Sequence, residues 1–293
     1  MAEPLFIVAP PRSYTSVVGG MLGQHPRAYG LPEVNLSHGD TLGDLWDSVP
    51  GAANFDTAGL LRLLAELNDG EQTDAAVTRA RAWILARPHW SGARVFAYIQ
   101  DKVGPDRMLV EKSPRNTMRP DNLRRLHRFF PRAGFLHLTR HPKTQGRSML
   151  DLIETYDPGG HVPDAERNWL RANANILDFA RGLGPGQYMQ IKGEMLLSDP
   201  KLYLAQICDW AGLDSGPDSI AAMLHPETSP FACLGPRAAP FGNDPNFLFT
   251  PKLDFDRLAR ISEPPLEGPV DWHDDKRPLS PPALRLARQF GYC

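Results

Sequence analysis

The clearest chemistry near the start of the sequence lies in the run Arg12-Ser13-Tyr14-Thr15-Ser16. A short β-prone run, Phe6 to Val8, and two prolines precede it, and an apolar helical pattern follows from Val17 to Gln24. The first turn of a helix has unpaired N–H groups and the positive end of the helix dipole, so it attracts anions. A guanidinium and several hydroxyls would add hydrogen-bond donors at the same point. The run predicts an anion-binding loop, although strand-loop-helix turns are also common without a ligand.

The loop differs from a Walker A loop, which needs G-x-x-x-x-G-K-S/T to wrap a phosphate and hold magnesium. The chain has no such string, and no acidic residue follows a strand where a magnesium ligand would stand. A phosphate-bearing donor that needs no metal is therefore the better fit.

Further polar groups follow other predicted strands. Glu33 lies in an extended segment, Tyr29 to Leu36, and Lys112 follows the strand that begins at Leu109. Arg140 follows the strand Gly134 to Thr139, and Ser148 stands about two turns into the helix that begins at Pro142. Because the carboxyl ends of parallel strands meet at one edge of a sheet, we expect these groups to share one cleft.

The alternation of strands and helices predicts an α/β fold of three layers, with a mostly parallel central sheet and helices on both faces. The remaining predicted elements are a strand over 188–191 and helices over 120–130, 200–211 and 282–289, with Gly212 ending the third. Residues 40–90 predict a helical insertion, and the Pro- and Gly-rich residues 226–251 predict a long structured loop. We expect residues 1–293 to form a single domain.

Composition limits the kinds of partner. A formal net charge of −2 gives no global attraction to nucleic acid or to an anionic membrane. The three cysteines show no CxxC spacing, which argues against a disulfide framework or a zinc cluster. The sequence has neither a signal-peptide pattern nor an apolar run of membrane-spanning length. These features predict a cytoplasmic protein with no membrane span, no nucleic-acid partner and no required metal.

In order along the chain, the motifs resemble those of sulfotransferases that use 3′-phosphoadenosine 5′-phosphosulfate (PAPS). Pro11 to Ser16 is similar to the P-K/R-S-G-T-S/T loop of that family, and Arg140 and Ser148 match its Arg and Ser pair in an R-x-P context. Glu111 to Asn116 resembles the D/E-K-S/T-P element of bacterial and carbohydrate sulfotransferases, and Glu194 to Pro200 resembles Y-E-D-L-x-x-D-P. Each motif is weak alone, but four in the right order over about residues 5–215 are fairly specific.

The resemblance implies a P-loop nucleotide-hydrolase-like fold with helical insertions. It implies transfer of a sulfuryl group from PAPS to a hydroxyl of a small-molecule, lipid or carbohydrate acceptor, leaving adenosine 3′,5′-bisphosphate (PAP). The donor site would be Arg12, Ser13, Tyr14, Thr15 and Ser16 at the phosphosulfate, with Arg140 and Ser148 at the 3′-phosphate. Arg237, in the long loop, either reaches the 3′-phosphate as well or is a solvated arginine.

In-line transfer needs stabilisation of the leaving oxygen and a base for the acceptor hydroxyl. Arg12 and Lys112 are the candidates for stabilisation. By the same resemblance Glu33 is the first candidate base, and His38, which could act with Asp40, is the second. We interpret His137 as a core histidine, because its neighbours in the central strand are apolar.

Tyr14 departs from the family pattern, which has glycine at this position. Glycine allows positive φ values that are costly to tyrosine. Either the loop differs slightly, or the Tyr14 ring turns outward into the acceptor pocket; we prefer the second alternative and expect Tyr14→Gly to affect the acceptor more than the donor.

Two other functions are compatible with the residues: a nucleotide-dependent kinase of related fold, and a nucleotide-binding protein without catalysis. The sequence does not identify the acceptor or the oligomeric state. Aromatic residues of the insertion could line an apolar pocket or belong to the core: Trp46, Phe55, Trp83 and Trp90. His161, Trp169 and the loop Phe231 to Phe249 are candidates for a lid.

Overall fold

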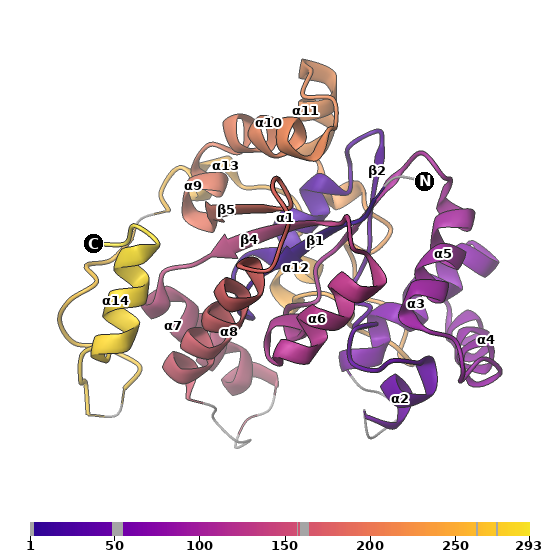
Figure 1. Cartoon of the computed structure of the whole chain (residues 1–293), viewed down its shortest axis with the longest axis horizontal. Helices are drawn as coiled ribbons and strands as arrows, with labels where there is room; N and C mark the ends of the chain where they lie inside the picture. Colours follow the sequence, from indigo (N-terminus) through magenta and orange to yellow (C-terminus); the bar gives the residue numbers. More distant parts are fainter. Residues whose placement is uncertain (1–2, 49–54, 157, 159–163, 262, 274) are drawn as a thin grey trace.

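The computed structural model describes residues 3–48, 55–156, 158, 164–261, 263–273 and 275–293. Within these ranges, five parallel strands form one sheet in the order β2-β3-β1-β4-β5 (Figure 1). The strands are β1 (Leu5–Val8), β2 (Ala28–Gly30), β3 (Met108–Glu111), β4 (Gly134–Thr139) and β5 (Tyr188–Lys192). The α/β class and the parallel sheet agree with the fold predicted from the sequence.

Helices pack on both faces of the sheet. The helices before β4 are α1 (Thr15–Leu22), α2 (Leu42–Asp47), α3 (Phe55–Asp69), α4 (Asp74–Leu85), α5 (Gly92–Val103), the 3-10 helix η1 (Pro114–Thr117) and α6 (Pro120–Phe129). Those after β4 are α7 (Pro142–Tyr156), α8 (Ala165–Ala180), α9 (Gly193–Ser198), α10 (Pro200–Ala211), α11 (Pro217–Met223), η2 (Pro226–Thr228), α12 (Pro245–Phe249), α13 (Phe255–Leu258) and α14 (Pro281–Gln289).

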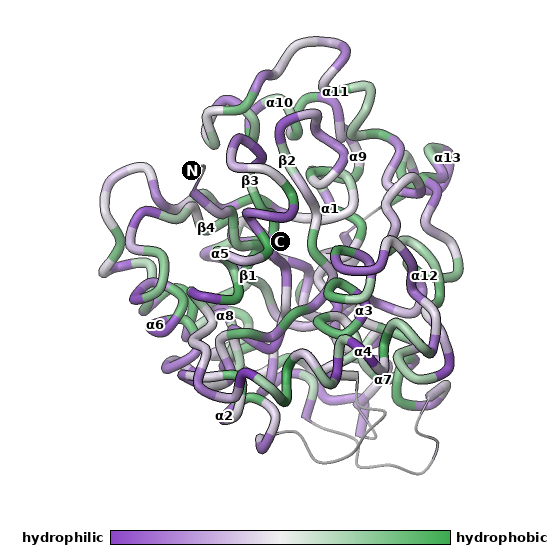
Figure 2. Tube along the Cα trace, turned by 90° about the vertical axis from the view of Figure 1, so that its right-hand side faces the viewer, coloured by the Kyte–Doolittle hydropathy of each residue, from purple (hydrophilic) through white to green (hydrophobic). Residues whose placement is uncertain are grey.

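The central strand β1 separates two hydrophobic cores. Phe6 and Val8 belong to the core shared with α3 and α5, whereas Leu5 and Ile7 belong to the core shared with α1 and α10. This alternation follows from the strand period of two, and a strand covered on both faces is apolar throughout. In Figure 2 the residues of β1, near the middle of the trace, have the green colour of hydrophobic residues.

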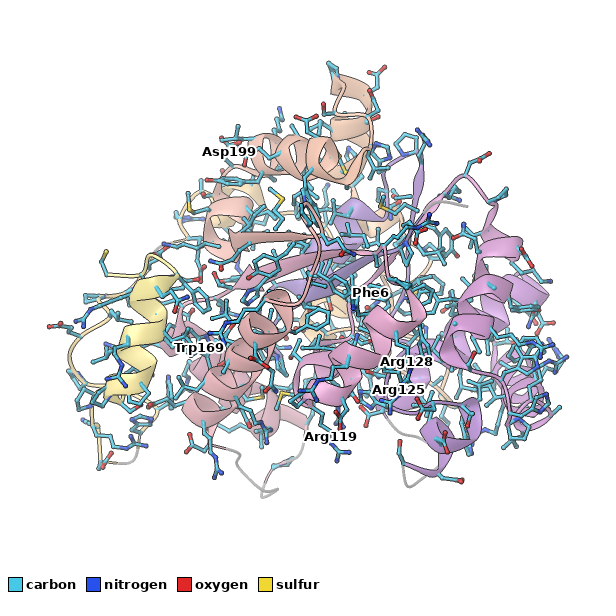
Figure 3. All side chains as sticks on the ribbon, in the orientation of Figure 1. Phe6, Arg119, Arg125, Arg128, Trp169 and Asp199 are labelled. Carbon is cyan, nitrogen blue, oxygen red and sulfur yellow. The ribbon has the colours of Figure 1, made fainter. Side chains whose placement is uncertain are left out.

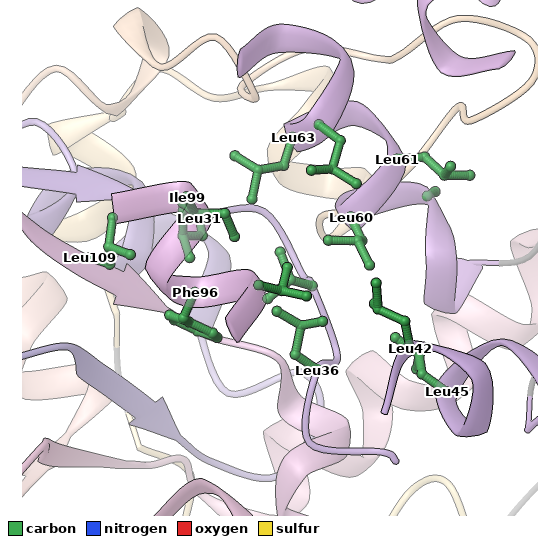
Figure 4. Close-up of a cluster of buried hydrophobic side chains, with 14 of the residues drawn as sticks. Leu31, Leu36, Leu42, Leu45, Leu60, Leu61, Leu63, Phe96, Ile99 and Leu109 are labelled. Carbon is green, nitrogen blue, oxygen red and sulfur yellow. The ribbon is translucent and has the colours of Figure 1, made fainter. Parts of the chain in front are cut away.

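The helical insertion has its own leucine-rich core. Leucines of α3 pack against Leu36, which lies in the loop after β2, and against Phe96 and Ile99 of α5 (Figure 4). The helical segment continues beyond the predicted 40–90 to Val103, because α5 follows α4 and closes this core. Trp83, Trp90 and Tyr98 form an aromatic cluster, with ring centroids 5.2 Å apart for Trp83 and Trp90.

The tryptophans of the insertion therefore do not line the cavity described below. Of the two interpretations offered by the sequence, the one that assigns them to the core is correct. Trp46 packs partly buried against the same core. The side chain of Phe55 lies outside the described residues.

Several predicted elements are confirmed, including β4, β5, α7, α10 and α14, and Gly212 ends α10 with a left-handed φ of 71°. The predicted extended segment over 29–36 is a strand only as far as Gly30, because Pro32 cannot donate to a sheet ladder. The loop over 226–251 contains η2 and α12 and is structured as expected.

The helix α8 was not predicted, and it changes the interpretation of Trp169. Trp169 is fully buried on α8, and its indole N–H donates to the carbonyl of Arg140 at 2.9 Å (Figure 3). Trp169 is thus not a lid residue, because its ring is part of the core under α14. Phe231 is likewise buried, and His161 lies outside the described residues. A search of the described helices finds none long and apolar enough to cross a membrane.

Candidate active site

The loop between β1 and α1 brings several donors to one point. Arg12 and Tyr14 both have left-handed backbone conformations, with φ of 68° and 65°. Tyr14 is the N-cap residue of α1, and no side chain caps the first turn of this helix. Ser13 is fully buried, and its hydroxyl has no partner among the described residues. The N-terminus of α1 is therefore an open cradle of N–H and O–H donors.

The Arg12 guanidinium connects this loop to two distant segments. Its Nε donates to Ser148 Oγ at 3.1 Å, which joins the loop to α7. Its NH1 forms an ion pair with Asp244, the N-cap residue of α12. Only 7% of the Arg12 side chain is exposed, so the guanidinium is fixed in position by these contacts.

Lys112 is a buried cation beside the same loop. Its Nζ donates to Ser16 Oγ at 2.9 Å and to Glu33 Oε1 at 3.2 Å, and its side chain is 2% exposed. The stem of Lys112 crosses α1 at Gly19, where an added Cβ would lie 2.8 Å from Lys112 Cγ. Glycine at this position lets the lysine pass between helix and sheet. Ser16 Oγ also accepts from the backbone N–H of Asp244 at 3.1 Å, so its own O–H points elsewhere.

Glu111 shapes the turn that presents Lys112. Its carboxyl group accepts from the N–H and the hydroxyl of Ser113 and from Asn116 Nδ2 at 2.9 Å. Burial raises the pKa of Glu111 to about 7, and the hydrogen bonds from Ser113 oppose that rise. Glu111 thus holds the loop and leaves Lys112 free to face Ser16.

Arg140 lies on the other side of the loop, against Tyr14. Its NH1 donates to the carbonyl of Arg12 at 2.6 Å, and its Nε donates to Thr144 Oγ1 at 3.3 Å. The guanidinium carbon lies 4.3 Å from the centre of the Tyr14 ring, a cation–π distance. Burial raises the pKa of Tyr14 to about 12.

The preferred orientation of Tyr14 was wrong. The ring packs against Arg140 and Gly193 and is absent from the lining of the cavity. The positive φ of Tyr14 does require a conformation suited to glycine, as the sequence comparison indicated.

A cavity of about 880 Å³ opens beside the loop. Arg12, Thr15 and Ser16 lie along it together with both candidate bases, Glu33 and His38. The structure therefore brings the proposed donor loop and the candidate bases to one space.

His38 lines this cavity, but Asp40, with which it could have acted, does not. Asp40 is 58% exposed and forms ion pairs with Arg125 and Arg128 of α6. Burial, with the nearby charges of Arg115 and Arg119, lowers the pKa of His38 to about 4, and its Nε2 is buried with no partner in the described part of the chain. The imidazole is neutral at pH 7.

Two other predicted residues lie outside this space. Arg237 is exposed, and the N–H of its neighbour Ala238 donates to Asp74 of α4 at 2.7 Å, which places this part of the loop against the helical insertion. His137 is fully buried, with its two ring nitrogens 2.7 Å from the Tyr188 hydroxyl and 3.0 Å from Asn173 Oδ1. The interpretation of His137 as a core histidine is confirmed.

Four charged residues of the cavity lining were not singled out from the sequence: Asp56, Asp244, Arg115 and Arg119. The Asp-Pro step at Asp244 could have indicated a helix N-cap there, because proline is favoured in the first turn. The only sequence signal for Arg119 is its position between Lys112 and a basic helix, which places it near the expected cleft.

Comparison with known proteins identifies the family. The sulfotransferase family model matches residues 4–217. The structure is similar to the sulfotransferase domain from the curacin biosynthetic pathway, at 26% sequence identity and a TM-score of 0.79, over 100% of this chain and 99% of that one. It is also similar to the sulfotransferase domain of the Synechococcus PCC 7002 olefin synthase, at 28% identity and a TM-score of 0.76, over 100% of this chain and 97% of that one. No curated protein sequence matches significantly.

The site and the comparisons agree. The motifs on which the family resemblance rested lie within the matched residues, and the fold of this chain is similar to that of the two solved domains. The chain belongs to the sulfotransferase family.

Proposed function

We propose that this sulfotransferase uses PAPS as donor and transfers the sulfuryl group to a hydroxyl of a small-molecule, lipid or carbohydrate acceptor. The observation that carries the proposal is the convergence of Arg12, Ser16 and Lys112 around an uncapped helix N-terminus, next to a cavity that contains Glu33. Both solved relatives are sulfotransferase domains of biosynthetic systems, which supports a small-molecule acceptor.

The residues present fit the donor. The buried Ser13 hydroxyl lacks a partner among the described residues, and a phosphate oxygen would satisfy it. The surrounding groups are hydroxyls, N–H groups, a guanidinium and an ammonium, which are the groups that bind phosphate and sulfate. A donor anion would take the place of the Asp244 carboxylate on Arg12. Arg140 and Ser148 are the residues we assign to the 3′-phosphate.

When bound, PAPS supplies the sulfuryl group and PAP is the leaving product. Lys112 and Arg12 would stabilise the negative charge that grows on the bridging oxygen. Lys112 is suited to this role because contacts with Ser16 and Glu33 already hold its ammonium in place, so little reorganisation is needed.

We assign the base to Glu33, with His38 as the alternative. Glu33 lies in the cavity 3.2 Å from Lys112 and therefore close to the donor loop. His38 also faces the cavity and is neutral, so its free Nε2 can accept a proton or a hydrogen bond. A positioned base contributes about 10²- to 10⁴-fold to the rate, so one substitution should decide between them.

Glu33→Gln and His38→Gln form a matched pair for that decision. We expect Glu33→Gln to lower single-turnover sulfation by about a hundredfold or more with PAP affinity nearly unchanged, and His38→Gln to have a smaller effect. Near-normal turnover by Glu33→Gln would remove Glu33 from the role, and a large loss in His38→Gln alone would transfer it to His38.

Calorimetry tests the donor. We expect PAP to bind without any divalent cation, and Arg140→Gln to weaken this binding by about tenfold or more. Sulfation is then followed with radiolabelled PAPS and a panel of alcohols. Binding of ATP that depends on magnesium, with no binding of PAP, would favour the kinase alternative. Tight PAP binding with no transfer to any alcohol would favour a binding protein without catalysis.

A further inference from the structure

The acceptor cavity has two unlike walls. Glu33, Arg12 and Ser16 mark the end at the donor loop. Away from that end, one wall is apolar and comes mainly from α7, and the other is cationic and comes from η1 and the start of α6. The apolar wall consists of Met118, Met149, Leu152, Ile153 and Tyr156, and the cationic wall includes Arg115 and Arg119 beside His38.

An aromatic contact fixes one residue of the apolar wall. The ring of Tyr156, which lines the cavity, meets the Phe241 ring edge to face, with centroids 5.9 Å apart, so the end of α7 touches the long loop. Water has few partners along such a wall, and an aliphatic segment of an acceptor would replace it favourably.

Charge on the cationic wall is only partly balanced. Arg115 forms an ion pair with Asp56 at 2.7 Å. Arg119, at the N-cap of α6, forms no ion pair with any carboxylate of the described residues, although it lines the cavity. In the view of Figure 3 it lies below α6, apart from Arg125 and Arg128, which pair with Asp40. Arg119 is an exposed residue of the lining and is thus accessible to an acidic group that enters the cavity.

His38 supports the same conclusion. Its Nε2 is buried and has no partner in the described structure, and burial, together with the charges of Arg115 and Arg119, lowers the pKa of the ring to about 4. An anion that entered here would satisfy both the guanidinium and, after protonation of the ring, the imidazole.

We propose that the acceptor is an amphiphile whose hydroxyl is joined through an apolar segment to an acidic group, a carboxylate or a phosphate monoester, and that Arg119 binds this acidic group. This inference rests on the proposed function, because it takes the cavity to be the acceptor site. Arg119 is then a specificity-determining residue: it selects acidic alcohols and takes no part in the chemistry of transfer.

Binding can be tested without turnover. Octanoate and octanol share an apolar chain, and PAP carries no sulfuryl group to transfer, so calorimetry with the PAP-bound protein reports recognition alone. We expect octanoate to bind about tenfold or more tightly than octanol, and Arg119→Gln to remove this preference. The matched control is Arg124→Gln, because Arg124 is also on α6 but is 65% exposed and already paired with Asp121.

Turnover gives a second readout. ω-Hydroxyoctanoate, its methyl ester and ω-hydroxyoctyl phosphate share one alcohol and differ in the acidic group, so the ratio of kcat/KM between the acids and the ester measures the role of charge. We expect this ratio to be about ten or more in the wild type and about one in Arg119→Gln, with the loss in KM rather than kcat. The better of the two acids identifies carboxylate or phosphate as the preferred group.

The two proposals fail separately. If PAP binds and the ester is sulfated as well as both acids, and Arg119→Gln changes none of these values, the acidic acceptor is refuted and the sulfotransferase assignment stands. If octanoate binds through Arg119 but PAP does not bind, the donor assignment is refuted instead. Equal binding of octanoate and octanol to the wild type overturns the inference directly.

Discussion

Replacing Tyr14 with glycine should weaken donor binding and leave acceptor binding unchanged. The Tyr14 ring lies 4.3 Å from the Arg140 guanidinium, whose remaining contacts are with the carbonyl of Arg12 and with Thr144. Without the ring, Arg140 gains rotamer freedom that donor binding must remove again. Ordering such a side chain costs about 0.5–1.5 kcal/mol, which corresponds to a rise of about twofold to tenfold in the Kd for PAP.

The stability of Tyr14→Gly should change less than removal of a ring normally implies. Loss of the partly buried ring costs about 2 kcal/mol, whereas glycine relieves about 1 kcal/mol of strain at a φ of 65°. We therefore expect a net loss of about 1 kcal/mol in the free energy of unfolding, measured by chemical denaturation. The protein would stay folded for the binding assays.

Two measurements decide whether Tyr14 acts on donor or on acceptor binding: calorimetric titration with PAP, and the acceptor KM at saturating PAPS. Tyr14→Phe is the matched control, because it keeps the ring under Arg140 and loses only the hydroxyl, so its Kd for PAP should stay within about twofold of the wild type. A normal Kd for PAP in Tyr14→Gly, together with a raised acceptor KM, would refute the reasoning and return Tyr14 to the acceptor side.

Three further substitutions test the site. Lys112→Met keeps the stem that packs at Gly19 and removes the buried charge, so single-turnover sulfation should fall about a hundredfold or more, and a near-normal rate would exclude Lys112 from charge stabilisation. Glu111→Gln should flatten the pH dependence of the free energy of unfolding. The pKa of Glu111 in the folded state is about 7 and exceeds the ordinary 4.5, so the group stabilises the fold at acid pH, and this contribution is lost as the pH rises from about 4.5 through 7. The same change in the free energy of unfolding between pH 4.5 and 7 for both proteins, measured by denaturation, would contradict this. Asp244→Asn keeps an N-cap for α12 and removes the ion pair with Arg12, so PAP should bind about fivefold more tightly by calorimetry; weaker binding would show that Asp244 assists the donor site.

Local patterns predicted most of the sheet and the position of the donor loop. β4 and the helix at Pro142 follow from an apolar run and a proline, and the polar groups after β1, β3 and β4 converge because parallel strands end at one edge. These features depend on residues close together in the sequence, so periodicity and turn chemistry reveal them.

What could not be predicted depends on contacts between distant segments. Asp244 meets Arg12 across 232 positions, and no local pattern identifies such a pair. The orientation of Tyr14 is decided by Arg140 and Gly193, which arrive from two other strand ends. The helix α8 escaped prediction although Asp164 caps it, and the burial of Trp169 follows from packing under α14 rather than from its own sequence context.

If the donor and acceptor bind as proposed, the ion pair between Asp244 and Arg12 links the two substrates thermodynamically. A donor anion on Arg12 would compete with Asp244 for one guanidinium, and the neighbours of Asp244, Asn243 and Pro245, form part of the cavity wall. Release of Asp244 by the donor would then change the wall that the proposed acceptor contacts. Such coupling is reciprocal, so the factor by which the donor changes acceptor affinity is also the factor by which the acceptor changes donor affinity. An affinity measured for either substrate alone then describes a different state of this wall from the one present during turnover.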